Sequence, residues 1–322
     1  MSSNENPQGW LPIALSSQVT AQAPLARRCC GREYVLFRDA DGSARILEDR
    51  CAHRKAPLSL GRITPEGWLE CPYHGWRYSG ATGDCMQIPN LARNETIPGN
   101  YCVENFTAAE RDGVVFLWQG ANPPGSERPV PDISLPEGER LGEGSCLITL
   151  PAHDLATTLL DAPWLVLDLP GLHIVPDHLQ GEPLLDERGL AVEWALDWAP
   201  LARRRRRTPG DYPLALALIL DEAGRAARVE IRDVASYRVV LSAGLYCAPV
   251  THCVSALHWR WAVNPPAVAG QPAYLVNAAD RLSLSMRSSV DATQLVALHP
   301  YISSVWLGRI PAVEPALTPS RR

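Results

Sequence analysis

Lysine is almost absent from this sequence: Lys55 is the only one, so nearly all of the 30 basic residues are arginines. Basic residues do not outnumber acidic ones, because 35 aspartates and glutamates give a formal net charge of −5 at pH 7. Proteins that bind nucleic acid through surface charge carry a basic excess. The composition therefore argues against a nucleic-acid partner.

Long hydrophobic runs are also missing. The opening residues, Met1 to Trp10, are polar and lack the apolar core of a secretory signal. The most apolar later stretch, Leu214 to Leu220, is far shorter than the roughly 20 residues that cross a bilayer as a helix. We therefore expect no membrane contact and a cytoplasmic location.

Cysteine is present, but in an odd number. In a long chain without an export signal, nine cysteines favour metal ligation and free thiols over a disulfide framework. The adjacent pair Cys29–Cys30 is most simply interpreted as buried thiols.

The N-terminal part has the pattern of a small antiparallel β domain. Tyr34 to Leu47 indicates a hairpin that turns at Asp41-Gly42. Further short strands are expected at residues 68–70, 76–78 and 114–118.

A chain of 322 residues is expected to hold two domains. We predict a first domain over residues 1–120, a linker rich in proline over 121–145, and a second domain over 146–322. In the second domain, strands are expected at residues 190–198, 228–234, 236–243 and 254–263, and a helix at about 288–307. The predicted fold class of this domain is α+β, an antiparallel sheet with helices on one side.

The chemistry is indicated by two short motifs, Cys51-Ala-His53 and Cys71-Pro-Tyr-His74, with 17 residues between His53 and Cys71. Each motif offers one thiolate and one imidazole. Two such loops folded toward each other can place two thiolates on one iron and two imidazoles on the other, which is the ligation of a Rieske [2Fe–2S] cluster. A structural zinc site of two cysteines and two histidines is the competing interpretation. Zinc fingers normally pair cysteine with cysteine and histidine with histidine, so the mixed pairs favour the iron–sulfur cluster.

The segments CAHRKAPLSLG and CPYHGW resemble the Rieske domain of the Rieske non-haem iron oxygenase alpha subunits, most similar to the group that includes the vanillate O-demethylase oxygenase component. The resemblance extends to TLLDAPW, APVTHCVSALHWRWAV and SSVDATQL. It implies that the second domain is a helix-grip (START/Bet v 1-like) fold. In the family, its pocket holds a mononuclear Fe(II) on two histidines and one carboxylate.

The chain departs from the family at this iron site. The family segment N-L-L-D-x-x-H-x4-H aligns so that Asp161 matches the aspartate that relays electrons between subunits, while Trp164 and Leu169 replace the two histidines. Asp291 matches the carboxylate ligand. An indole and an isobutyl group cannot ligate iron, so the resemblance implies that the mononuclear Fe(II) is absent. Asp161 could instead cap or hydrogen-bond a helix.

A displaced iron site remains an alternative. His173 and His178 have H-x4-H spacing downstream and could form a triad with Asp291. Pro170-Gly171 aligns with a Pro-Gly of the family, which places both histidines outside the site, and Pro176 disfavours a regular helix between them.

The leading hypothesis is an auxiliary alpha-type subunit that carries electrons to a homologous catalytic oxygenase subunit in a mixed trimer or hexamer. The family assembles as head-to-tail rings of three. The alternatives are a self-sufficient monooxygenase or demethylase of a small aromatic or heterocyclic substrate, and a redox-sensing protein that binds a small ligand. No Gly-rich dinucleotide fingerprint follows a strand, so electrons are expected to come from a separate flavin- or ferredoxin-type reductase.

Overall fold

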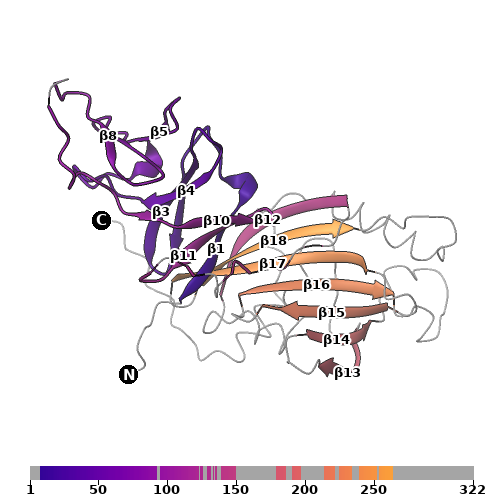
Figure 1. Cartoon of the computed structure of the whole chain (residues 1–322). Coiled ribbons are helices and arrows are strands. Elements are labelled where there is room, and N and C mark those ends of the chain that lie inside the picture. Colours follow the sequence, from indigo (N-terminus) through magenta and orange to yellow (C-terminus); the bar gives the residue numbers. More distant parts are fainter. Residues whose placement is uncertain are drawn as a thin grey trace, which may run out of the picture.

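The structure is a computed structural model of the whole chain (Figure 1). It describes residues 8–92, 95–122, 124–125, 129–131, 133, 135, 139–149, 179–185, 191–196, 214–221, 225–233, 239–251 and 254–263. The helix expected at 288–307 lies outside these residues, so the predicted helix-grip arrangement stays a prediction.

The expected N-terminal hairpin is confirmed. β3 (Arg32–Arg38) pairs antiparallel with β4 (Ala44–Glu48), and Gly42 in the turn has the positive φ of 77° that glycine adopts without strain. β2 (Leu25–Cys29) and β9 (Asn105–Phe106) complete a four-stranded sheet in the order β2-β3-β4-β9.

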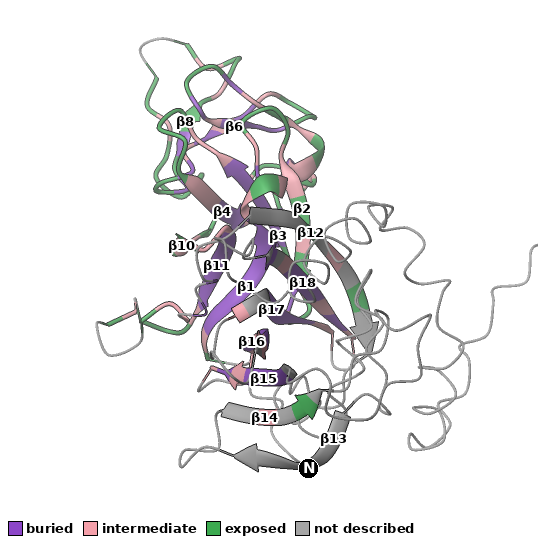
Figure 2. Cartoon of the chain, turned by 90° about the vertical axis from the view of Figure 1, so that its right-hand side faces the viewer, coloured by how far each residue is buried: buried purple, intermediate pink, exposed green. Residues whose placement is uncertain are grey.

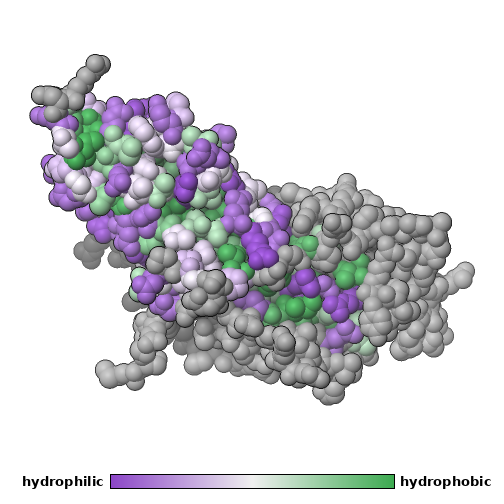
Figure 3. All heavy atoms as spheres, in the orientation of Figure 1, coloured by the Kyte–Doolittle hydropathy of each residue, from purple (hydrophilic) through white to green (hydrophobic). Residues whose placement is uncertain are grey.

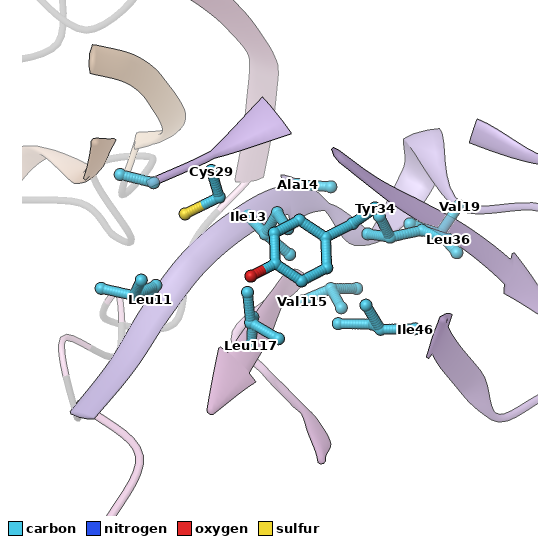
Figure 4. Packing of buried hydrophobic residues seen from close by; sticks show 11 residues of the cluster. Leu11, Ile13, Ala14, Val19, Cys29, Tyr34, Leu36, Ile46, Val115 and Leu117 are labelled. Carbon is cyan, nitrogen blue, oxygen red and sulfur yellow. The ribbon is translucent and has the colours of Figure 1, made fainter. Parts of the chain in front are cut away.

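A second N-terminal sheet has three strands in the order β1-β11-β10. They are β1 (Gly9–Leu15), β11 (Val114–Gln119) and β10 (Ala108–Arg111), and β11 confirms the strand expected at 114–118. Their apolar side chains pack against those of β3 and β4 to form one core (Figure 4). The short 3-10 helix η1 (Ser16–Gln18) follows β1.

A third sheet consists of four very short strands in the order β5-β6-β7-β8. Their bounds are Arg62–Ile63, Leu69–Glu70, Arg77–Tyr78 and Cys85–Gln87, and the 3-10 helix η2 (Leu58–Leu60) precedes them. β6 and β7 confirm the strands expected at 68–70 and 76–78. The loop between β6 and β7 contains the second predicted motif, Cys71 to His74.

The C-terminal part of the described chain is a seven-stranded antiparallel sheet in the order β12-β18-β17-β16-β15-β14-β13 (Figure 1). In that order, the strands span Glu139–Thr149, Val254–Val263, Val239–Thr251, Ala226–Asp233, Leu214–Leu220, Ala191–Leu196 and Leu179–Leu185. This sheet confirms that the second domain contains an antiparallel sheet. Its strand β18 has the bounds that the alternating pattern predicted.

The N-terminal sheets pack directly on the large sheet. Trp10, Phe116 and Trp118 share a buried cluster with Ala226 and Tyr246, which neighbour each other on β16 and β17. Figure 2 shows the buried strands meeting where the two parts join. Apolar contact therefore fixes the position of the N-terminal part on the large sheet. Among the described residues, no helix has the length and apolar character needed to cross a membrane.

Candidate iron–sulfur centre

The first motif lies in a tight loop after β4. The N–H of Cys51 donates to the carbonyl oxygen of Ala56 (2.9 Å), and the N–H of Lys55 donates back to the carbonyl oxygen of Cys51 (2.9 Å). Lys55 has a φ of 59°, which is uncommon for a residue other than glycine. The loop therefore closes around its cysteine.

The second motif repeats this backbone pattern between β6 and β7. The N–H of Cys71 donates to the carbonyl oxygen of Trp76 (2.8 Å), and the N–H of Gly75 donates to the carbonyl oxygen of Cys71 (3.2 Å). Gly75 has a φ of 69° and stands four residues after its cysteine, as Lys55 does. The two halves of the centre are thus built alike.

The structure brings the four predicted ligands together in two pairs that differ in exposure. Cys51 and Cys71 are 1% and 3% exposed, whereas His53 and His74 are both exposed, with ring centroids 4.7 Å apart. Trp76 stacks on His53 at 4.7 Å with only 4° between the ring planes, which fixes that ring. In the described part of the chain, no three His, Cys, Asp or Glu side chains converge as ligands of one ion.

The surroundings of each ligand suit its role. The pKa of His53 is lowered by desolvation and by the charges of His74 and Arg54, which favours the neutral imidazole that binds metal. Burial raises the pKa of the Cys71 thiol, while the backbone N–H groups of Tyr73 and His74 donate to its sulfur and act in the opposite direction. Such N–H groups stabilise a thiolate bound to iron.

Tyr78 is a partner that the sequence did not single out. Its hydroxyl lies 3.1 Å from the sulfur of Cys51 and accepts a hydrogen bond from the N–H of Ala52 (3.2 Å). Burial, together with the hydrogen bond to Cys51, raises the pKa of Tyr78, so the hydroxyl keeps its proton. Tyr78 could have been predicted from the sequence, because it is an aromatic residue on the strand that directly follows the second motif.

Apolar side chains are exposed on the same part of the molecule as the two histidines. They include Leu60 and Tyr73, which are 73% and 67% exposed, and also Met86 and Tyr101. The ring of Tyr73 lies 3.9 Å from that of His74, and the ring of Tyr101 lies 5.0 Å from that of Trp76. Figure 3 shows apolar surface at the end of the molecule that carries β5 and β8 in Figure 1.

The sequence predicted that the mononuclear iron of the family is absent, with a displaced iron site as the alternative, and the structure describes none of the residues concerned. Asp161, Trp164, Leu169, His173, His178 and Asp291 all lie outside the described residues. His258, for which the sequence predicted no ligand role, is 1% exposed and lies 2.6 Å from the Ser145 hydroxyl, measured from Nδ1.

Comparison with known proteins supports the N-terminal assignment. Residues 9–106 match the family model of the Rieske [2Fe-2S] domain. The chain is 38% identical over 122 residues to the protein TIC 55 of Arabidopsis thaliana, covering 38% of this chain and 22% of that protein. It is 45% identical over 118 residues to the putative toluene-4-sulfonate monooxygenase system iron-sulfur subunit TsaM2 of Comamonas testosteroni, covering 35% of this chain and 32% of that subunit. The matched part thus spans less than a third of either relative.

Solved structures share the fold over nearly the whole chain. Dicamba monooxygenase with non-heme iron and dicamba aligns with a TM-score of 0.61 at 19% identity, over 95% of this chain and 91% of that one. The caffeine-bound QL mutant of NdmA from Pseudomonas putida CBB5 aligns with a TM-score of 0.59 at 21% identity, over 97% and 85% of the two chains. At this identity the likeness shows the fold alone. The sequence matches, together with the paired loops, identify residues 9–106 as a Rieske [2Fe–2S] domain homologous to those of Rieske oxygenase subunits.

Proposed function

We propose that this chain is an electron-carrying subunit of a Rieske-type oxygenase system, and that it supports a homologous catalytic subunit. The observation that carries the proposal is the pair of exposed histidines, His53 and His74, beside two buried thiols. With this arrangement, an electron can enter and leave through imidazoles at the surface while the thiolates stay shielded from water.

The chain's own residues suit a [2Fe–2S] cluster. Cys51 and Cys71 would hold the inner iron, and His53 and His74 the outer one. When bound, the cluster stores one electron, and its histidine ligands raise the reduction potential above that of an all-cysteine cluster. Trp76 holds the ring of His53 in place, and the Tyr78 hydroxyl, 3.1 Å from the Cys51 sulfur, would donate to it once Cys51 is a thiolate.

Exposed apolar residues on the same part of the molecule as the histidines, with Tyr73 directly beside His74, support docking to a protein partner. Contiguous apolar surface with polar residues around it marks interaction sites, and electron-transfer encounters use small interfaces. Tyr73 directly beside His74 would bring the partner's surface close to the cluster. Two relatives are themselves named as subunits, TsaM2 and the 3-chlorobenzoate-3,4-dioxygenase oxygenase subunit of Comamonas testosteroni, which supports a system of several components.

The auxiliary role is supported by the sequence at the positions where the family binds its mononuclear iron. Trp164 and Leu169 stand there, and neither side chain can donate a lone pair to Fe(II). Asp161, where the family has its relay aspartate, would then serve at the contact between subunits. Such a chain would pass on electrons but would not activate oxygen by itself.

Metal and sulfide analysis of the anaerobically purified chain tests the proposal. We expect two irons and two acid-labile sulfides per chain, rapid reduction by a flavin- or ferredoxin-type reductase, and substrate oxidation only with a homologous subunit present. His53→Ala should abolish reduction, whereas His258→Gln, a change of a buried histidine in the large sheet, should leave it intact.

Two results would reject parts of the proposal separately. A single metal ion without sulfide would reject the cluster. A third bound iron that is lost in His173→Ala, together with turnover by the chain alone, would reject the auxiliary role and establish the displaced site of His173, His178 and Asp291.

A further inference from the structure

Two adjacent cysteines lie where the N-terminal sheets meet the large sheet. Cys29 ends β2, and Cys30 and Gly31 form the turn into β3, with positive φ values of 51° and 74°. The N–H of Cys30 donates to the carbonyl oxygen of Pro249 (2.8 Å), and that of Gly31 to the carbonyl oxygen of Val250 (2.9 Å). This turn is therefore a hydrogen-bonded contact between the hairpin and β17.

The two sulfurs are close but differ in their surroundings. They lie 3.9 Å apart. Cys29 is 1% exposed and belongs to the core cluster with Leu11 and Ile13, as Figure 4 shows. Cys30 is only partly buried, so it is the more accessible residue of the two.

The positive charge of a partly buried arginine, Arg225, acts on the pair. The backbone of Arg225 is fixed, because its N–H donates to Asp221 Oδ1 (2.6 Å) and its carbonyl oxygen accepts from the N–H of Cys247 (2.8 Å). Its charge acts on the thiols of Cys29 and Cys30. Among the described residues, its buried Nη1 has no hydrogen-bond partner.

These neighbours divide the roles of the two thiols. The hydrogen bond between the two sulfurs and the charge of Arg225 lower the pKa of Cys30, and together they outweigh desolvation, which raises it. The same hydrogen bond and burial raise the pKa of Cys29. Cys30 is thus the nucleophile, because the thiolate is the reactive form, and Cys29 keeps the proton that a leaving group needs.

We propose that Cys29 and Cys30 are a redox modification site, which a peroxide oxidises reversibly to a disulfide between the two neighbouring residues. The Cys30 thiolate attacks one oxygen of hydrogen peroxide, the O–O bond breaks, and hydroxide leaves; Cys30 then carries a sulfenic acid. The Cys29 sulfur attacks the sulfenic sulfur, an S–S bond forms, the S–O bond breaks, and water leaves with the proton of Cys29. The hydroxide takes up the proton that Cys30 released when it ionised. In total, two thiols lose two electrons and one peroxide becomes two waters.

The spacing of the pair favours a switch over a permanent crosslink. Neighbouring Cα atoms across a trans peptide are about 3.8 Å apart, closer than the ~4.4–6.8 Å that disulfides normally span. A disulfide here is therefore readily reduced again. Because forming it turns the peptide between the cysteines, it displaces the N–H of Cys30 from Pro249 and loosens the contact of the hairpin with β17.

Mass spectrometry of the holoprotein tests the proposal directly. After titration with hydrogen peroxide and alkylation, trypsin releases the peptide Cys29 to Arg32, which contains both cysteines and no other. We expect this peptide to lose two hydrogen atoms and to resist alkylation, and dithiothreitol to restore both thiols. Hydrogen exchange of residues 246–251 should increase in the oxidised form, while the cluster absorbance is followed throughout.

Variants separate the roles of the neighbours. Arg225→Gln should slow the oxidation about tenfold, which corresponds to a rise of one unit in the pKa of Cys30, and Arg225→Lys should restore most of the rate. Cys102→Ser, which removes an exposed cysteine elsewhere, should change nothing. The proposal is overturned if both thiols survive peroxide that already oxidises Cys102, if Cys30 goes on to sulfinic acid, or if the disulfide joins Cys247 instead.

Discussion

The hydroxyl of Tyr78 lies 3.1 Å from the sulfur of Cys51, at the buried side of the candidate iron–sulfur centre. The pKa of Tyr78 is raised by burial and by this sulfur, so the hydroxyl is a stable hydrogen-bond donor. A donor to a ligand sulfur stabilises the extra negative charge of the reduced cluster, and it therefore raises the reduction potential.

Replacing Tyr78 by phenylalanine should lower the reduction potential. If the hydrogen bond is about 1 kcal/mol stronger in the reduced state, its loss lowers the potential by roughly 40 mV. A redox titration followed by absorbance measures this shift, with iron content as a check on cluster assembly. Tyr34→Phe removes a buried hydroxyl whose nearest partner is Gln119, so it should leave the potential unchanged. An unchanged potential in Tyr78→Phe would show that the hydroxyl does not donate to the cluster.

Each of the two loops contains one residue with a positive φ, Lys55 in the first and Gly75 in the second, and this leads to a second prediction. Gly75→Ala should destabilise the second loop, because the added Cβ would sit at a φ of 69° and 3.0 Å from Pro89 Cγ. A non-glycine residue in this conformation costs about 1–2 kcal/mol. Lys55→Ala is the matched control: Lys55 already has a Cβ at the same position of the first loop.

The stability of the loops in both variants can be compared by the rate at which iron is released in moderate urea. We expect faster release from Gly75→Ala and an unchanged rate from Lys55→Ala. Equal rates would show that the strain is absorbed elsewhere in the loop.

Sequence reasoning succeeded where a pattern had one physical cause. The spacing of Cys51, His53, Cys71 and His74 predicted two facing loops, and the structure places the two loops side by side; the role of the four residues as cluster ligands stays a prediction. The alternation of Val254 to Val263 predicted β18 with its observed bounds, because successive side chains of a strand point to opposite faces. The structure buries both faces in the middle of this strand, where Leu257, His258 and Trp259 are all buried.

Sequence reasoning failed where a feature depends on contacts between distant parts of the chain. The run Leu214–Leu220 forms β15, but a short apolar run does not distinguish a strand from a buried helix. The contact of Tyr78 with Cys51 joins residues on different elements, and no local pattern encodes it. The sequence alone did not predict that the turn of Cys29 and Cys30 contacts β17, or that the charge of Arg225 acts on its thiols.

A buried carboxylate in the cluster-bearing sheet gives a third prediction. Glu70, 8% exposed, pairs with Arg62 Nη2 (2.6 Å) and Arg77 Nε (2.7 Å). Glu70→Gln should lower the free energy of unfolding by about 2 kcal/mol, because the charge of Arg77 loses its partner in a partly buried place. Urea unfolding at pH 7 measures the loss. Glu33→Gln breaks a half-exposed pair with Arg28 and should cost less than about 0.5 kcal/mol. If both variants lost a similar free energy of unfolding, the burial of Glu70 would not strengthen its ion pairs.

His258 makes the unfolding free energy depend on pH. Desolvation, and then the charge of Arg27, lower its pKa to about 3, although a hydrogen bond to the Ile13 backbone acts the other way. The folded protein keeps this imidazole neutral, whereas the unfolded chain takes up a proton below a pKa of about 6.5. The contribution of His258 to stability is therefore complete above pH 6.5 and is lost as the pH falls toward 3.

Comparison of the wild type with His258→Gln isolates this effect, because both proteins keep the same cluster histidines. Between pH 6 and pH 4, the wild type should lose about 1.4 kcal/mol more per pH unit than the variant, since it unfolds with the uptake of one additional proton. Urea unfolding at several pH values measures both slopes. Ser145→Ala removes the hydroxyl partner but keeps the imidazole buried, so it should retain the wild-type slope. Parallel profiles for the wild type and His258→Gln would show instead that the folded protein accepts a proton at His258 as readily as the unfolded chain does, and that the junction beside β1 is open to water.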